Sequence, residues 1–190
     1  MVEGVVHFDN VEALDPFDRV ALPAGELISL PFTGEHADLN ILSKQALALT
    51  LHGRTLLFLV DSDGRDPMLY QRVMAHVGPV EAVFLGMECD GAPLNWLYDP
   101  LLGGGVNRRH NDSRRLSGAD CARAMTVLQA IEPGQVYIYA MGQEPWLKYI
   151  MGLEYTPEAV QLRESNACIA ACAALGISAE RLFGSKELLL

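Results

Sequence analysis

The segment from Leu56 to Val60 reads LLFLV, and it is apolar at every position before the chain reaches Asp61. A strand this apolar is expected where both faces of a sheet are covered, whereas a strand with one solvated face alternates apolar and polar residues. Residues 44–51 predict a partner strand, because a His52-Gly53 turn separates the two runs. The chain must therefore build its core around a sheet whose central strands have no solvated face.

The remaining predicted elements add two short strands at the start and then alternate helices with strands. The short strands surround a Pro-Ala-Gly turn at residues 23–25. The later elements, read from their caps and periodicity, are a helix from Asp66 to Gly78, a strand at 80–87, a helix from Ser117 to Gly134, a strand at 135–141 and a helix over at least the second half of 156–176. This order predicts one α/β domain with helices packed on a sheet, and ligands at the carboxyl ends of its strands.

The charge balance excludes several classes of partner. The chain has 24 acidic and 14 basic residues, a formal net charge of −10. Phosphate binding needs clustered Lys and Arg, so a nucleic-acid partner is not expected. The N-terminus lacks the basic region and apolar run of a signal peptide, and no apolar run is long enough to span a bilayer. We therefore expect a cytoplasmic protein that binds neither nucleic acid nor membranes.

Cysteine usage agrees with a reducing compartment. The four cysteines, Cys89, Cys121, Cys168 and Cys172, form no Cys-x-x-Cys pair. Neither their count nor their spacing indicates a disulfide framework or a structural zinc site. They are interpreted as buried free thiols.

Asp61 is the most informative single residue. A carboxylate at the exit of an apolar strand is costly to bury unless it is paired or bound to a cation. The alternative is an ordinary strand-to-helix turn, in which Asp61 bonds to backbone amides. Asp66, five residues later, fits that structural role as a helix cap. For Asp61 the functional interpretation is favoured.

A second strand exit carries the segment GEHADLN, which places Glu35, His36 and Asp38 close together. Glu35 and His36 are adjacent, so in an extended chain they point in opposite directions and only one of them faces a site. Imidazole suits iron or zinc, and a carboxylate suits iron or manganese. A lone histidine is more often structural than ligating, and that alternative stays open.

Two further strand exits carry polar side chains. Glu88 and Asp90 follow the strand at 80–87, and Gln143 and Glu144 follow the strand at 135–141. Such residues could orient metal ligands from the second coordination shell. They could equally be ordinary loop residues, which is the favoured interpretation for Glu88 and Asp90. The chain has no Gly-x-Ser-x-Gly motif and no phosphate loop.

Taken together, these segments resemble the C-terminal half of a metallo-β-lactamase-fold protein. More narrowly, they resemble the dinuclear-iron β-hydroxylase branch, whose members hydroxylate a carrier-bound amino acid. The segments that carry the resemblance are LPFTGEHADLNILSK, LLFLVDSDG, FLGMECDGAPLNWLYDPLL, SRRLSGAD and VYIYAMGQEPWLKYIMGL. The resemblance implies a fold of αββα layers, with the N-terminal half absent or incomplete in this chain.

The resemblance also implies a ligand set. Asp61 would be the carboxylate that bridges two metals, and Glu35 would be a terminal ligand of one iron, with His36 as the substitute if the alignment is shifted by one. The implied cofactor is dinuclear iron, with zinc as the alternative. The implied substrate is an amino acid bound to a carrier protein.

The chain departs from the family at its defining signature, His-x-His-x-Asp-His. All five histidines are isolated: His7, His36, His52, His76 and His110. A dinuclear site is therefore not completed by this chain, which alone would hold no metal or only part of a site. A truncated gene, a divergent protein that has lost its metal, and a half that pairs with a partner chain are three explanations. A metallohydrolase of the same superfamily and a non-catalytic module in an oligomer or complex remain the alternatives to an oxygenase.

Overall fold

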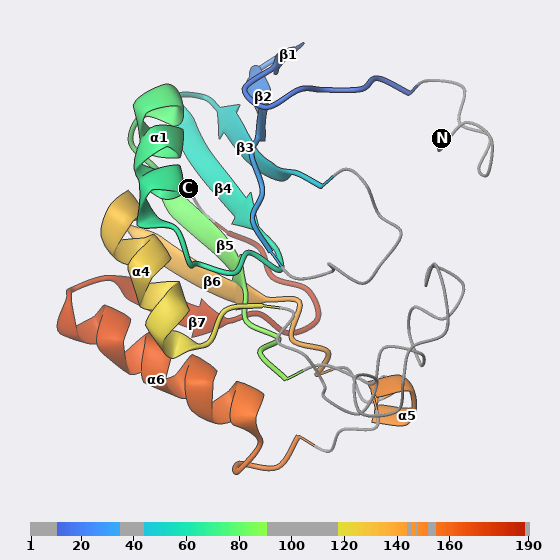
Figure 1. The fold of residues 1–190 in the computed structure, drawn as a ribbon, viewed down its shortest axis with the longest axis vertical. Coiled ribbons are helices and arrows are strands. Elements are labelled where there is room, and N and C mark those ends of the chain that lie inside the picture. The colour runs from blue at the N-terminus through green and yellow to red at the C-terminus, as the bar shows by residue number, and fades with distance from the viewer. Residues whose placement is uncertain are drawn as a thin grey trace.

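The computed structural model describes residues 11–34, 44–90, 118–143, 146, 148–151 and 155–188 (Figure 1). Within them, seven strands form one sheet in which the spatial order follows the chain order. The strands are β1 Arg19–Leu22, β2 Gly25–Leu30, β3 Ala46–Leu51, β4 Arg54–Leu59, β5 Ala82–Gly86, β6 Gln135–Tyr139 and β7 Ser178–Arg181. Neighbouring strands from β1 to β4 pair antiparallel, and those from β4 to β7 pair parallel.

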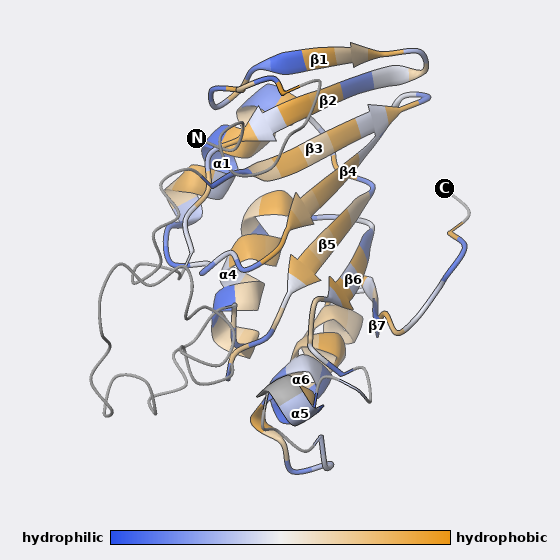
Figure 2. Ribbon diagram, turned by 90° about the vertical axis from the view of Figure 1, so that its right-hand side faces the viewer, coloured by the Kyte–Doolittle hydropathy of each residue, from blue (hydrophilic) through white to orange (hydrophobic). Residues whose placement is uncertain are grey.

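The helices connect the parallel strands. They are α1 Pro67–Val77, α4 Cys121–Ile131, the short α5 Lys148–Met151 and α6 Val160–Ala174. Parallel strands are joined by right-handed crossovers, and here each crossover steps in the same direction along the sheet. The helices α1, α4 and α6 therefore lie in a row on one face of the sheet (Figures 1 and 2). None of the helices in the described part is long and apolar enough to cross a membrane.

Local sequence signals explain where the helices begin and end. Asp66 caps α1 by accepting a hydrogen bond from the Met68 N–H at 2.9 Å, and Gly78 ends it with a φ of +73°. Helix α4 begins at Cys121, with Asp120 as its cap. The predicted capping box began the helix earlier, at Ser117, which lies outside the described residues.

One feature of the C-terminal region was not predicted. Helix α6 over Val160–Ala174 agrees with the predicted helix, whereas the strand β7 had no counterpart in the prediction. The sequence of β7, SAER, has no apolar alternation, because it is a short strand at the edge of the sheet. Its position is fixed by pairing with β6, which sequence periodicity does not reveal.

The core lies on both faces of the central strands. Leu57 and Leu59 point to the helix-covered face, and Leu56 packs with Phe84 and Tyr137 on the other face. Phe84 and Tyr137 are only 8% and 7% exposed. The segment after β7 contributes Leu182 and Leu188 to this second cluster, and Figure 2 shows that segment on the side away from the helices. The prediction of a sheet covered on both faces is confirmed for β4, β5 and β6.

Candidate metal centre

The turn after β4 places Asp61 in an unusual backbone conformation. Asp61 has a φ of +54°, in the left-handed region that non-glycine residues rarely adopt. The following residues join the turn to the segment after β2, because Ser62 forms a β-bridge with Gly34 and the Asp63 N–H donates to the Thr33 carbonyl at 2.9 Å. A Cβ on Gly34 would lie 2.3 Å from the Asp61 carbonyl oxygen. Two strand exits therefore meet directly at Asp61.

Glu35 and His36 come immediately after Gly34 in the sequence. Both residues, and Asp38, lie outside the described residues. The structure brings the chain against Asp61 as far as Gly34. The ligand roles of Glu35 and His36 stay predictions.

The exit of β5 brings a second carboxyl group to the same place. Glu88 Oε1 is buried and has no hydrogen-bond partner among the described residues. Burial, together with the nearby carboxylates of Asp61 and Asp90, raises the pKa of Glu88 to about 8, and burial is the largest of these causes. The structure thus brings together three of the predicted polar residues, Asp61, Glu88 and Asp90, at the carboxyl ends of β4 and β5.

Contacts from other elements hold the β5 exit in place. The Gly118 N–H donates to the Glu88 carbonyl at 3.0 Å. The side-chain amide of Gln161, a residue of α6 that is only 1% exposed, donates to the Asp90 carbonyl. Because both contacts go to the main chain, they fix the segment without neutralising its carboxylates.

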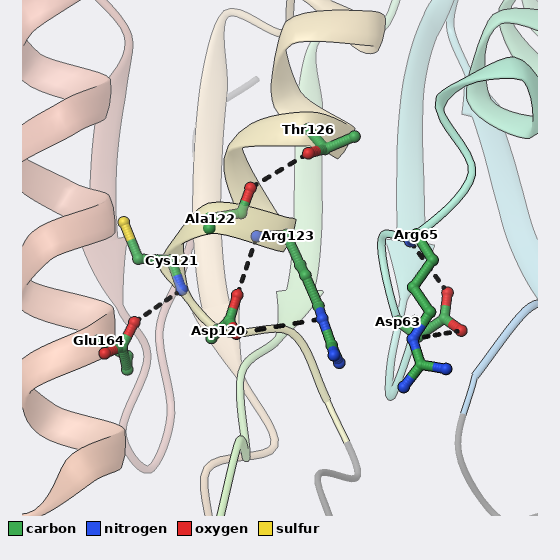
Figure 3. A network of polar contacts seen from close by, with 8 residues as sticks. All are labelled: Asp63, Arg65, Asp120, Cys121, Ala122, Arg123, Thr126 and Glu164. Carbon is green, nitrogen blue, oxygen red and sulfur yellow. Dashed lines mark hydrogen bonds and ion pairs between the residues drawn. The ribbon is translucent and has the colours of Figure 1, made fainter.

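The turn after Asp61 also packs against the first turn of α4 at Gly64 and Arg123. Figure 3 shows the polar contacts within each of these two segments. A Cβ on Gly64 would lie 2.5 Å from the Arg123 carbonyl oxygen, so only glycine allows this approach. Asp120 accepts from the Arg123 N–H at 2.9 Å, and the Cys121 N–H donates to the Glu164 carboxylate at 3.0 Å. The loop that carries Asp61 is therefore anchored to two helices through α4.

The exit of β6 adds Tyr139, the last residue of that strand. Burial raises the pKa of Tyr139 to about 12, and the Asp61 carboxylate contributes to that rise. Of the two polar residues predicted at this exit, Gln143 is half-buried and Glu144 lies outside the described residues. The signal that could have found Tyr139 is its place as the last residue of a strand beside two acidic strand exits.

The arrangement fits one side of an iron site. Its donors are carboxylate oxygens, one of them buried without a partner, and their mutual repulsion would be relieved by a cation. Within the described residues, however, no group of three or more His, Cys, Asp or Glu side chains is arranged to hold a metal ion. A complete site therefore needs ligands from beyond the described residues, where Glu35 and His36 are the predicted ones.

His76 and the cysteines, which are also potential metal ligands by residue type, have structural roles. His76 stacks on Phe17 with ring centroids 3.9 Å apart, and its Nδ1 lies 2.8 Å from the Arg72 carbonyl oxygen. All four cysteines are free thiols, and Cys89, Cys168 and Cys172 are buried, as predicted. Burial raises the pKa of Cys89 to about 12, so its thiol stays protonated and unreactive.

Comparison with known proteins gives a closely related enzyme. No protein-family model matches the chain. The 4-amino-L-phenylalanyl-[CmlP-peptidyl-carrier-protein] 3-hydroxylase of Streptomyces venezuelae is 38% identical to it over 175 residues, which are 92% of this chain and 33% of the enzyme. The crystal structure of CmlA, a diiron β-hydroxylase from Streptomyces venezuelae, superposes with a TM-score of 0.81 over 92% of this chain. The chain resembles the diiron β-hydroxylases.

The likeness to CmlA has a defined extent. A solved mutant of the CmlA β-hydroxylase gives a TM-score of 0.77 at 36% identity, over 93% of this chain. The chain spans about a third of the length of these relatives, 34% of CmlA and 33% of the mutant. CmlA has the metallo-β-lactamase fold, and the predicted fold class is therefore confirmed. The described residues form one sheet and one layer of helices of that fold.

Proposed function

We propose that this chain is part of a metal-dependent oxygenase that hydroxylates the β-carbon of an amino acid held on a carrier protein. The observation that carries the proposal is the similarity to the 3-hydroxylase, which is 38% identical over 92% of the chain. The geometry supports it, because Asp61 and Glu88 meet at the carboxyl ends of adjacent parallel strands, where ligands of such sheets bind.

In this proposal, Asp61 is the bridging carboxylate of a dinuclear iron site, and Glu35 is a terminal ligand with His36 as its substitute. Glu88 and Asp90 orient these ligands. When bound, the iron supplies the redox chemistry that activates dioxygen. Zinc is the alternative metal, because imidazole and carboxylate donors bind it as well.

Two residues of this chain would take part in the reaction. The carboxylate of Asp61 would be a ligand of the metal. The carboxyl group of Glu88 holds a proton near neutral pH in the metal-free protein, and a bound cation would release it. Phe58 and Phe84 stack with ring centroids 4.6 Å apart and belong to the apolar cluster on the sheet face away from the helices.

A second candidate function is a non-catalytic module that assembles with a partner chain or as an oligomer. The observation in its favour is that the described residues hold no complete group of metal ligands. A metallohydrolase has no observation in its favour beyond the shared fold. In each case we propose a single partial metallo-β-lactamase-like domain spanning 1–190, and the free thiols favour the cytoplasm.

Product analysis tests the oxygenase proposal. The full chain would be incubated with Fe(II), a reductant, dioxygen and a carrier protein loaded with aromatic amino acids. The expected product is a carrier-bound amino acid that has gained one oxygen atom from labelled dioxygen. Release of the free amino acid without added oxygen would instead indicate a hydrolase, and an unchanged carrier would favour the non-catalytic module.

A further inference from the structure

The first half of helix α6 buries polar side chains where apolar ones are usual. Gln161 is 1% exposed, and Ser165, one turn later, is fully buried. Burying an amide is costly unless it is hydrogen-bonded, and an apolar side chain would avoid that cost. The side-chain amide of Gln161 donates to the carbonyl of Asp90, which is 71 residues away in the sequence. The polar residue at position 161 therefore holds the segment that leaves β5.

That segment begins with a tight turn centred on Glu88. The Cys89 N–H donates to the Met87 carbonyl at 2.8 Å, and a hydrogen bond between residues two apart defines a γ-turn. Met87 and Cys89 are buried on either side of Glu88, with exposed fractions of 0% and 4%. Because both neighbours are fixed by burial, the direction in which the Glu88 side chain points depends on the shape of this turn.

The turn at Glu88 is enclosed by other parts of the chain. The Gly118 N–H donates to the Glu88 carbonyl at 3.0 Å, and a Cβ on Gly118 would lie 3.1 Å from the Glu88 nitrogen. On the other side, a Cβ on Gly86 would lie 2.8 Å from the Asp61 nitrogen, so the end of β5 packs closely against the end of β4. Gln161 then holds the chain just after the turn.

We propose that Gln161 is a positioning residue of the candidate site: its hydrogen bond to the Asp90 carbonyl fixes the turn at Glu88, which keeps the Glu88 carboxyl group buried beside the end of β4. Glu88 Oε1 is buried without a hydrogen-bond partner among the described residues, so the surrounding main chain determines where this oxygen lies. A role of Glu88 toward a metal rests on the proposed function, whereas the positioning of Glu88 does not.

Two variants of α6 separate this role from ordinary packing. Gln161→Met keeps a long, unbranched side chain and removes the amide that donates to Asp90. Ser165→Ala is the matched control. The Ser165 hydroxyl donates to the Gln161 carbonyl at 2.7 Å and accepts from Arg181 at 3.0 Å, so its loss removes buried hydrogen bonds that do not reach the β5 exit. Only Gln161→Met releases the turn at Glu88.

The first test is amide hydrogen exchange of the metal-free full chain, followed by NMR. In Gln161→Met we expect the Gly118 and Cys89 amides to exchange about tenfold faster or more, relative to the amides of β3, which report global unfolding. Ser165→Ala should leave this ratio unchanged within about twofold. If the Gly118 amide in Gln161→Met changed only as much as the β3 amides, the positioning role would be overturned.

The second test is Fe(II) affinity under anaerobic conditions. Gln161→Met should weaken Fe(II) binding by about tenfold, the lower end of the loss usual for a residue that orients a ligand, and Ser165→Ala should not. Because Gln161 acts through Glu88, Gln161→Met should change the affinity by less than about twofold in a Glu88→Gln background.

Equal losses of Fe(II) affinity with and without Glu88, or no loss in either background, would overturn the action through Glu88. If the unsubstituted chain bound no Fe(II), the proposed function would fail. Hydrogen exchange would still decide in that case whether Gln161 holds the turn at Glu88.

Discussion

The charged side chains at the two ends of the central parallel strands are arranged in opposite ways. At the amino ends, Arg54 and Glu81 form an ion pair of 3.4 Å, with side chains 49% and 36% exposed. At the carboxyl ends, burial raises the pKa of Glu88 to about 8, and the nearby carboxylates of Asp61 and Asp90 contribute to that rise. One end pairs opposite charges in solvent, and the other gathers like charges where solvation is poor. Such unfavourable clustering is typical of functional sites, because a bound ligand or metal compensates it.

The largest expected effect on Fe(II) binding comes from crowding the close approach of Gly86 to the end of β4, at the carboxyl end of the strands. In Gly86→Ala the new Cβ would lie 2.8 Å from the Asp61 nitrogen, so the end of β4 must shift. We expect a loss of about 1–3 kcal/mol of unfolding free energy, as for overpacked cores, together with a loss of Fe(II) binding. Urea unfolding and metal titration would measure both.

Gly134, at the amino end, is the control for this substitution. A Cβ there would lie 3.2 Å from the Glu81 carbonyl oxygen, a contact that a small movement relieves. Gly134→Ala should keep Fe(II) binding intact and cost less stability than Gly86→Ala. Equal losses of stability and of Fe(II) binding in the two variants would mean that both ends of the strands tolerate an added methyl group equally. That result would contradict the difference between the two ends.

The next effect is the pH dependence that Glu88 gives to the metal-free protein. Its pKa is raised from 4.5 to about 8 on folding, so the folded state binds the proton more tightly. The contribution of Glu88 to the free energy of unfolding is therefore highest below pH 4.5, falls as the pH rises toward 8, and is constant above pH 8. Glu88→Gln removes this loss and should be more stable than the unsubstituted protein at pH 8.5, by on the order of 2–4 kcal/mol.

Added Fe(II) should reverse this order, because the cation stabilises the ionised carboxyl group that the variant lacks. Urea unfolding at pH 5 and 8.5, with and without metal, would measure the difference. Glu158→Gln, an exposed substitution, is the control and should show neither effect. A Glu88→Gln variant less stable than the unsubstituted protein at pH 8.5 without metal would contradict the assignment.

The smallest effect is expected at the amino end. Glu81→Gln removes the charge that faces Arg54, but both side chains are solvated. Exposed ion pairs contribute only about 0–1 kcal/mol, and salt screens them. Thermal unfolding at low and high salt should show a small loss that disappears in high salt. A loss as large as the effect at Glu88 would remove the contrast between the two ends.

Much of the fold could be predicted because its signals are local. The run ending at Asp61 predicted a strand covered on both faces, and Asp66 and Gly78 marked the ends of α1. The strand β7 could not be predicted, because its four residues depend on pairing with β6 rather than on their own pattern. Local chemistry therefore identified the elements that contain their own caps or periodicity.

The candidate site was predictable only in part. Strand exits are readable from sequence, so Asp61 and Glu88 were both noted, but the favoured view of Glu88 as a loop residue took no account of its burial beside Asp61. The place of Tyr139 beside Gly86 depends on the register of β5 and β6, which the sequence does not show. Register and burial arise from the assembled sheet, and neither can be read from the order of residues.

The most direct test of a metal site at the carboxyl end is anaerobic titration of the full chain with Fe(II), comparing Asp61→Asn with Asp66→Asn. The two carboxylates are five residues apart, and Asn preserves the cap of α1 at position 66. We predict saturable binding that Asp61→Asn abolishes and Asp66→Asn retains. Equal binding by both variants and the unsubstituted chain, or no binding by any of them, would contradict a metal site at Asp61.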